Sequence, residues 1–100
     1  VYGEQGNYDS AKEFVNKAIA NYEMHYGKEH LVVGKSLNHL GRIYILEQNL
    51  PKAKEVVIKA LGILEKANHP EKYRSLELLG DMYAERSQKE VQISGQTSKY

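Results

Sequence analysis

Apolar residues recur along this chain every three or four positions, which is the spacing of one face of an α-helix. Four such stretches follow one another, and glycine, asparagine or proline lies between them. The pattern predicts helices near residues 9–26, 31–47, 51–67 and 71–86, so the expected fold class is all-α. The two middle helices have the clearest apolar faces: Leu37, Leu40, Gly41 and Tyr44 in one, Ala53, Val57 and Ala60 in the other.

The breaks between these stretches predict where helices start and stop. Gly6–Asn7 is expected to be a turn that closes a helix over residues 1–5. One residue of the Asp9–Ser10 pair can then cap the next helix, because a short side-chain oxygen accepts from free backbone N–H groups. Gly27 suits a left-handed C-terminal cap, and Pro51 suits the first residue of the third helix.

The last helix carries a weaker signal. Its apolar stripe consists of Tyr73, Leu76, Leu79, Gly80 and Tyr83. Beyond Arg86 the apolar content falls, and residues 94–100 have the composition of a flexible tail. We therefore expect the folded part of the chain to end near residue 93.

The chain also matches itself at two shifts, which is the signature of a repeat protein. A shift of 42 residues superposes Tyr2 on Tyr44, Tyr8 on Leu50, Ala11 on Ala53, Val15 on Val57 and Ala18 on Ala60. A shift of 39 residues superposes Leu37 on Leu76, Leu40 on Leu79, Gly41 on Gly80 and Tyr44 on Tyr83. Each unit is therefore a pair of helices, and one complete unit lies between two incomplete ones.

The complete unit resembles a tetratricopeptide repeat, whose pattern has a large residue, Leu-Gly, Tyr and then small and large residues at helical spacing. The residues that carry the resemblance are Leu37, Leu40, Gly41, Tyr44, Ala53, Val57 and Ala60. The period is longer than usual and is similar to that of kinesin light chain repeats, although Leu31 and Gln48 replace that type's usual proline and glycine. The resemblance implies a right-handed superhelical array of antiparallel helix pairs, with units at 1–30, 31–69 and 70–93 and a tail at 94–100.

Small residues explain how the helices of a unit approach each other closely. Gly41 and Ala53 are expected where the two helices cross, and Gly80 has the same role by analogy. Each unit buries only part of its apolar surface, and about three repeats make a stable array. Since this chain holds fewer, we expect marginal stability or self-association through exposed repeat ends, which would give a homo-oligomer.

Composition narrows the function classes. Fourteen Lys and Arg residues against thirteen Asp and Glu leave a net charge of +1, so no basic field draws the chain to nucleic acid or to an acidic membrane. The absence of cysteine excludes disulfides, thiolate zinc sites and a cysteine nucleophile. No apolar run approaches the roughly 18 residues of a membrane helix. We expect a cytoplasmic protein and, because the sequence starts at Val1, a piece of a longer one.

Few residues suggest chemistry. The histidines (His25, His30, His39 and His69) show no metal-ligand spacing, so we expect them to be exposed or to cap helices and expect no metal or other cofactor. No serine lies in a Gly-x-Ser-x-Gly turn and no glycine loop is placed to hold a phosphate, so no enzyme active site is predicted. The repeated tyrosines are assigned to the core rather than to stacking on nucleic-acid bases.

In tetratricopeptide arrays the first helices of successive units line a concave surface that receives a peptide or helix of a protein partner. This resemblance, carried over by helical spacing, predicts one face of the second helix and the residues 39 positions later. The predicted partner-binding residues are Lys35, Asn38, Arg42, Ile45 and Leu46, then Arg74, Glu77, Asp81, Ala84 and Glu85. Asn38 is expected to point outward and to bond a peptide backbone, while Lys35, Arg42 and Arg74 favour an acidic segment.

The predicted function is therefore protein–protein recognition on that face. Two alternatives stay open. The chain is a structural spacer or regulatory segment of a larger multidomain enzyme or signalling protein, and the face is then merely solvated. Otherwise the repeat ends associate with other copies of the chain.

Overall fold

The computed structural model of the chain describes the backbone of residues 2–97 and the side chains of residues 7–84. It contains four helices over this part: α1 (Tyr2–Tyr26), α2 (Leu31–Leu46), α3 (Leu50–Lys66) and α4 (Lys72–Thr97). No strand occurs in the described residues. The all-α prediction is confirmed.

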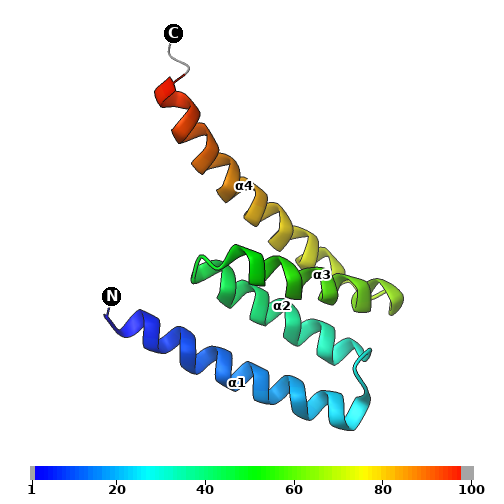
Figure 1. Cartoon of the computed structure of the whole chain (residues 1–100). Helices are drawn as coiled ribbons and strands as arrows, with labels where there is room; N and C mark the ends of the chain where they lie inside the picture. The colour runs from blue at the N-terminus through cyan, green and yellow to red at the C-terminus, as the bar shows by residue number, and fades with distance from the viewer. Residues whose placement is uncertain (1, 98–100) are drawn as a thin grey trace.

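The helices form an open array rather than a closed bundle. Figure 1 shows α2 and α3 side by side in the middle, α1 along one side of this pair, and α4 crossing it on the other. The closest packing is that of α2 on α3, while α1 contacts only α2 and α4 contacts α3 and α2. The array is elongated and thin, with extents of 59 × 35 × 16 Å. Each outer helix is therefore left with a large face that no other described helix covers.

The connection between α2 and α3 is a tight turn at the positions that the sequence predicted. Gln48 adopts a left-handed conformation with φ of 65°, the backbone role that the family usually gives to glycine. Asn49 then caps α3, because its side-chain oxygen accepts from the backbone N–H of Lys52 at 3.4 Å. The helix starts at Leu50, so Pro51 is its second residue rather than its first. Gly27 has φ of 94°, as expected for a left-handed cap after α1.

The core lies where the two middle helices meet, and it uses the predicted residues. Gly41 faces Val57 so closely that a Cβ atom at position 41 would overlap with a methyl group of Val57. One buried cluster has members from α1, α2 and α3. It consists of Val15, Ile19, Val33, Leu37, Leu40, Ile43, Ala60, Ile63 and Leu64. A second cluster joins α3 to α4 and consists of Ala53, Val57, Leu78 and Met82. Glycine and alanine at the crossing thus let α2 and α3 exclude water from the large side chains around them.

The predicted turn at Gly6–Asn7 is wrong, because α1 runs without interruption through both residues. The Asp9–Ser10 pair consequently lies inside α1 and caps nothing. A turn between two helices is held by the packing of one helix on the other. Among the described helices α1 packs only on α2, so no helix before Gly6 holds such a turn, and continuous backbone hydrogen bonding is favoured. Val1 lies outside the described residues.

The predicted apolar stripe of α4 is largely exposed, which is a second correction. Tyr73, Leu76 and Tyr83 are 64%, 49% and 56% exposed, and Gly80 has open space beside it. Instead, α4 buries Ser75, Leu78 and Met82 against α2 and α3. The stripe corresponds to the face with which α2 meets α3. On α4 only Leu79 of this stripe is partly buried, because it packs against the cluster that joins α3 to α4.

Phe14 of α1 is exposed in the same way, although its spacing places it on the apolar face of that helix. Its side chain is 77% exposed, although its neighbour Val15 is buried. At the other end of the chain, α4 continues past the end expected near Arg86 and reaches Thr97, so residues 94–97 are helical rather than a tail. Residues 98–100 lie outside the described part, and the boundaries of the three units stay predictions.

Candidate partner-binding surface

The face predicted to bind a partner forms one side of a groove between α2 and α4. A cavity of about 360 Å³ in this groove is lined by Arg42, Ile45, Leu46, Arg74, Glu77, Leu78 and Asp81. Six of these are predicted partner-binding residues, and they come from two helices separated by α3 in the sequence. The spacing of 39 residues thus brings both predicted faces to one surface. We call it the α2/α4 groove.

A second, smaller cavity of about 90 Å³ continues this groove toward the start of α2. Its lining residues are Lys35, Asn38, His39, Arg42, Glu71, Arg74 and Leu78. Arg42 and Arg74 line both cavities, so the two form one surface. Eight of the ten predicted contact residues therefore lie along one groove. Ala84 is exposed near its far end, and the side chain of Glu85 lies outside the described part.

Asn38 does not point outward as expected. It is only 2% exposed, and its amide nitrogen donates to the backbone oxygen of Glu71 at 3.3 Å. Its side-chain oxygen accepts from the hydroxyl of Ser75, a fully buried side chain, at 2.6 Å. Asn38 thus fixes α4 on α2 and satisfies polar groups that would otherwise be buried without partners. Its side chain is already used within the fold and is not available to a peptide backbone.

The charged side chains of the α2/α4 groove are exposed and segregated by sign. Arg74 pairs with Glu77 at 3.4 Å on the same helix, an exposed interaction that contributes little to stability. Neither Lys35 nor Arg42 has an ion-pair partner among the described residues. Near Lys35, the cations Lys35, Arg42 and Arg74 therefore outnumber the one carboxylate, Glu71, while Glu77 and Asp81 lie toward the other end of the groove.

Three of the histidines contact backbone groups within four residues of themselves. His30 caps α2, because its Nδ1 accepts from the backbone N–H of Val32 at 3.1 Å. His69 accepts from the backbone N–H of Glu71 at 3.0 Å, and the ring of His25 lies 2.9 Å from the carbonyl oxygen of Asn21. No group of three or more His, Cys, Asp or Glu side chains with the geometry of a metal site occurs in the described part of the chain.

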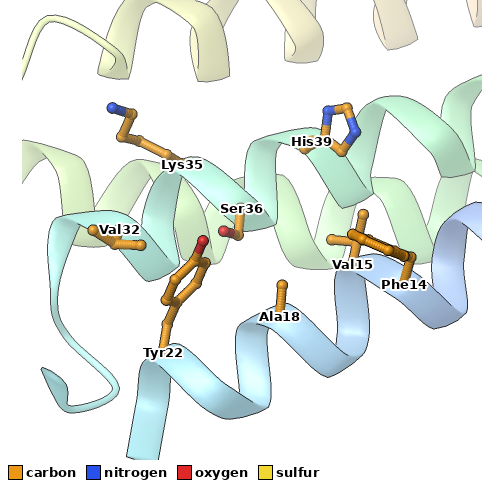
Figure 2. A pocket seen from close by; sticks show the side chains of 8 residues that line it. All are labelled: Phe14, Val15, Ala18, Tyr22, Val32, Lys35, Ser36 and His39. Atoms are coloured by element: carbon orange, nitrogen blue, oxygen red, sulfur yellow. The ribbon is translucent and has the colours of Figure 1, made fainter. Parts of the chain in front are cut away.

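A groove that the sequence did not predict lies between α1 and α2. Figure 2 shows Phe14, Val15, Ala18 and Tyr22 of α1 facing α2 across it. The cavity measures about 420 Å³, and Lys35 and His39 lie on its rim with the α2/α4 groove. We call it the α1/α2 groove. A signal is present in the sequence, because Phe14 lies at helical spacing from Ala11, Ala18 and Tyr22 and a shift of 42 residues places it on Val56.

One polar contact ties α1 to the far end of α2. The amine of Lys12 lies 2.8 Å from both carboxylate oxygens of Glu47, and it sits over the ring of Tyr44, 5.4 Å from the ring centre. The hydrogen bond to Glu47 raises the pKa of Lys12 above its ordinary value. This contact closes one end of the α1/α2 groove and fixes α1 relative to α2.

No helix in the described part of the chain is both long enough and apolar enough to cross a membrane. Comparison with known families gives one match: the model of the family described as "Tetratricopeptide repeat" matches residues 1–66. The match covers the whole of α1, α2 and α3, the region that contains the closest helix pair. Searches of curated proteins and of solved structures found no match. The finer likeness to kinesin light chain repeats stays a prediction.

Proposed function

Because this chain belongs to the tetratricopeptide repeat family, whose members are generally non-catalytic protein-interaction modules, we propose that it binds a segment of a protein partner in the α2/α4 groove. The observation that supports this most is the convergence of α2 and α4. Exposed groups from both helices line one continuous surface, and no described element covers it. A surface assembled from two rigid helices loses little conformational freedom on binding.

The chemistry of the groove suggests the chemistry of its partner. Ile45 and Leu46 supply apolar surface in the larger cavity of the groove, where a side chain of the partner is expected to insert. Lys35, Arg42 and Arg74 favour carboxylates at one end. At the other end, Glu77 and Asp81 repel an acidic group of the partner and attract a basic one.

We therefore expect a short peptide with an acidic end, an apolar residue in the middle and a basic end. A peptide that is acidic throughout would meet Glu77 and Asp81 and is expected to bind more weakly. This expected charge pattern of the peptide is more specific than the preference for an acidic segment that the sequence predicted. Burial of Asn38 removes the peptide-backbone contact assigned to it.

Fluorescence polarisation of labelled peptides tests the proposal. The probe has two glutamates, a leucine and two lysines in that order, and its control has the same composition with the charges intermixed. The R42A/R74A double variant is expected to bind the probe about ten-fold more weakly, which corresponds to about 1.4 kcal/mol. Lys59→Ala, which removes an exposed charge from α3 outside the groove, serves as the matched control.

The affinity of the double variant decides the outcome. If R42A/R74A and Lys59→Ala bind the probe as tightly as the parent, the α2/α4 groove is not the binding site. If the parent also binds the probe and its intermixed control equally well, the charge segregation has no role in recognition. A spacer function within a larger protein would then be favoured.

A further inference from the structure

Two apolar surfaces of this chain lack a packing partner among the described helices, and they lie at opposite sides of the array. One is the α1/α2 groove, where Phe14 is 77% exposed. The other is the outer face of α4, which we define as Leu76, Leu79, Gly80 and Tyr83; of these, only Leu79 packs partly against α3. Leu76 and Tyr83 on this face are 49% and 56% exposed. Large apolar patches of this kind mark sites of association.

We propose that these two surfaces bind each other, so that α4 of one copy of the chain docks in the α1/α2 groove of a second copy. The α1/α2 groove and the outer face of α4 lie outside the α2/α4 groove, although Lys35, Glu77 and Asp81 at their edges are also predicted peptide contacts. The proposal goes beyond the proposed function, and peptide binding can be measured independently.

The first argument is that the wall of the α1/α2 groove repeats the wall on which α2 already packs. A shift of 42 residues places Phe14, Val15, Ala18 and Tyr22 of α1 on Val56, Val57, Ala60 and Leu64 of α3. Those α3 residues form the surface that α2 covers, and Val57, Ala60 and Leu64 are fully buried there. The α1/α2 groove is therefore shaped to receive a helix that resembles α2.

The second argument is that α4 is such a helix. Its outer face stands 39 residues after Leu37, Leu40, Gly41 and Tyr44, with which α2 packs on α3. Gly41 is needed because a Cβ atom there would overlap with Val57, yet Gly80 has no atom within 4 Å of the corresponding position. A glycine inside a helix weakens that helix. Close approach of α1 from a second copy supplies the reason for Gly80 that the single chain lacks.

Charge supports the same pairing. Within one chain, Asn38 and Arg42 are the residues with which α2 faces α4. The residues 39 positions later are Glu77 and Asp81, so a docked α4 would present two carboxylates to α2 of the second copy. Lys35 and His39 lie on that rim, as Figure 2 shows, and they offer a complementary charge.

The proposed contact between α4 and α1 resembles the α2–α3 contact less closely at the end near Tyr73 and Tyr22. Tyr73 and Tyr22 stand where the α2–α3 contact has Gly34 and Leu64, and a Cβ atom at Gly34 would already lie 3.0 Å from Leu64. Two tyrosine rings need more room than this pair. The docked helices must therefore lie farther apart at that end than α2 and α3 do.

The docking has a definite symmetry. Because α4 and the α1/α2 groove are different surfaces, the contact is heterologous and leaves one of each surface free at the ends of the assembly. Copies are thus added head to tail, and the average mass rises steadily with concentration instead of stopping at a dimer. In each contact α4 of one copy and α1 of the next form a helix pair equivalent to α2 and α3.

Sedimentation velocity of the 100-residue chain from micromolar to millimolar concentration tests the proposal. The parent is expected to change from monomer to a series of larger species. Phe14→Glu, which charges the groove, and Leu76→Glu, which charges α4, are each expected to stay monomeric over this range. Both side chains are exposed, so the variants should fold as the parent does, which circular dichroism checks. Ile58→Glu, an exposed apolar residue on α3 outside both surfaces, is the matched control and should associate like the parent.

Mixing the two variants gives the sharpest readout. The Phe14→Glu chain keeps an intact α4, and the Leu76→Glu chain keeps an intact groove, so an equimolar mixture has one functional contact and should stop at a 1:1 dimer. A parent that is monomeric at every concentration would overturn the proposal. So would association that both variants retain, or a mixture that stays monomeric although the parent associates.

Discussion

Helices α2 and α4 carry the same apolar pattern 39 residues apart, yet one is covered and the other is not. Leu37 of α2 is 5% exposed, whereas its equivalent Leu76 in α4 is 49% exposed. A Cβ atom added at Gly41 would overlap with Val57, whereas a Cβ atom added at Gly80 would meet no atom within 4 Å. An apolar pattern therefore specifies which face of a helix can pack, and only a neighbouring helix decides whether that face is buried.

Polar positions show the same difference. Asn38 of α2 is buried and holds Ser75, whereas its equivalent Glu77 in α4 is exposed and pairs only with Arg74 among the described residues. A side chain on this face of the first helix of a unit lies against the first helix of the next unit. In a repeat array, the same repeat position can thus be buried in one unit and exposed in another.

The largest expected effect is that of truncating the equivalent leucines. Leu37→Ala removes a buried side chain and should lower the free energy of unfolding by about 2–5 kcal/mol. Leu76→Ala removes an exposed one and should lower it by less than about 1 kcal/mol. Urea unfolding of dilute protein, followed by circular dichroism, measures both. Equal losses for the two variants would mean that α4 is covered as fully as α2.

The equivalent glycines should give the next largest effect. Gly41→Val places a side chain where Val57 already lies, and overpacking of this kind costs about 1–3 kcal/mol. Gly80→Val meets open space in the single chain, and valine is a slightly better helix former than glycine, so its stability should change by less than about 0.5 kcal/mol. Thermal unfolding of the two variants beside the parent checks this. If Gly41→Val unfolds at the same temperature as the parent, Gly41 has no role in the close crossing.

The sequence predicted the middle of the fold because its signals there are local. Gly41, Tyr44 and Val57 lie on helices that are adjacent in the chain, so each finds its partner across a short turn. The errors fall where packing depends on something farther away. No other described helix packs beside Gly6–Asn7, and none covers Leu76 on α4, so neither forms the structure that the repeat pattern alone predicts.

The candidate site was predictable to a similar extent. Helical spacing placed Arg42 and Arg74 on faces that do meet in one groove. Burial of Asn38 could not be foreseen, because it depends on Glu71 and Ser75, which lie 33 and 37 residues later. The α1/α2 groove was missed for the opposite reason: Phe14 has a core-like position in the pattern but no helix on top of it.

Amide hydrogen exchange of the dilute, monomeric chain tests most directly whether α2 and α4 differ only in being covered. Exchange is compared between residues 37–44 of α2 and the equivalent residues 76–83 of α4. Because α4 is covered on one side only, its amides should open locally and exchange at least about ten-fold faster, a difference of about 1.4 kcal/mol or more. Equal protection of the two segments would contradict the account, since it would mean that both helices open only when the whole chain unfolds.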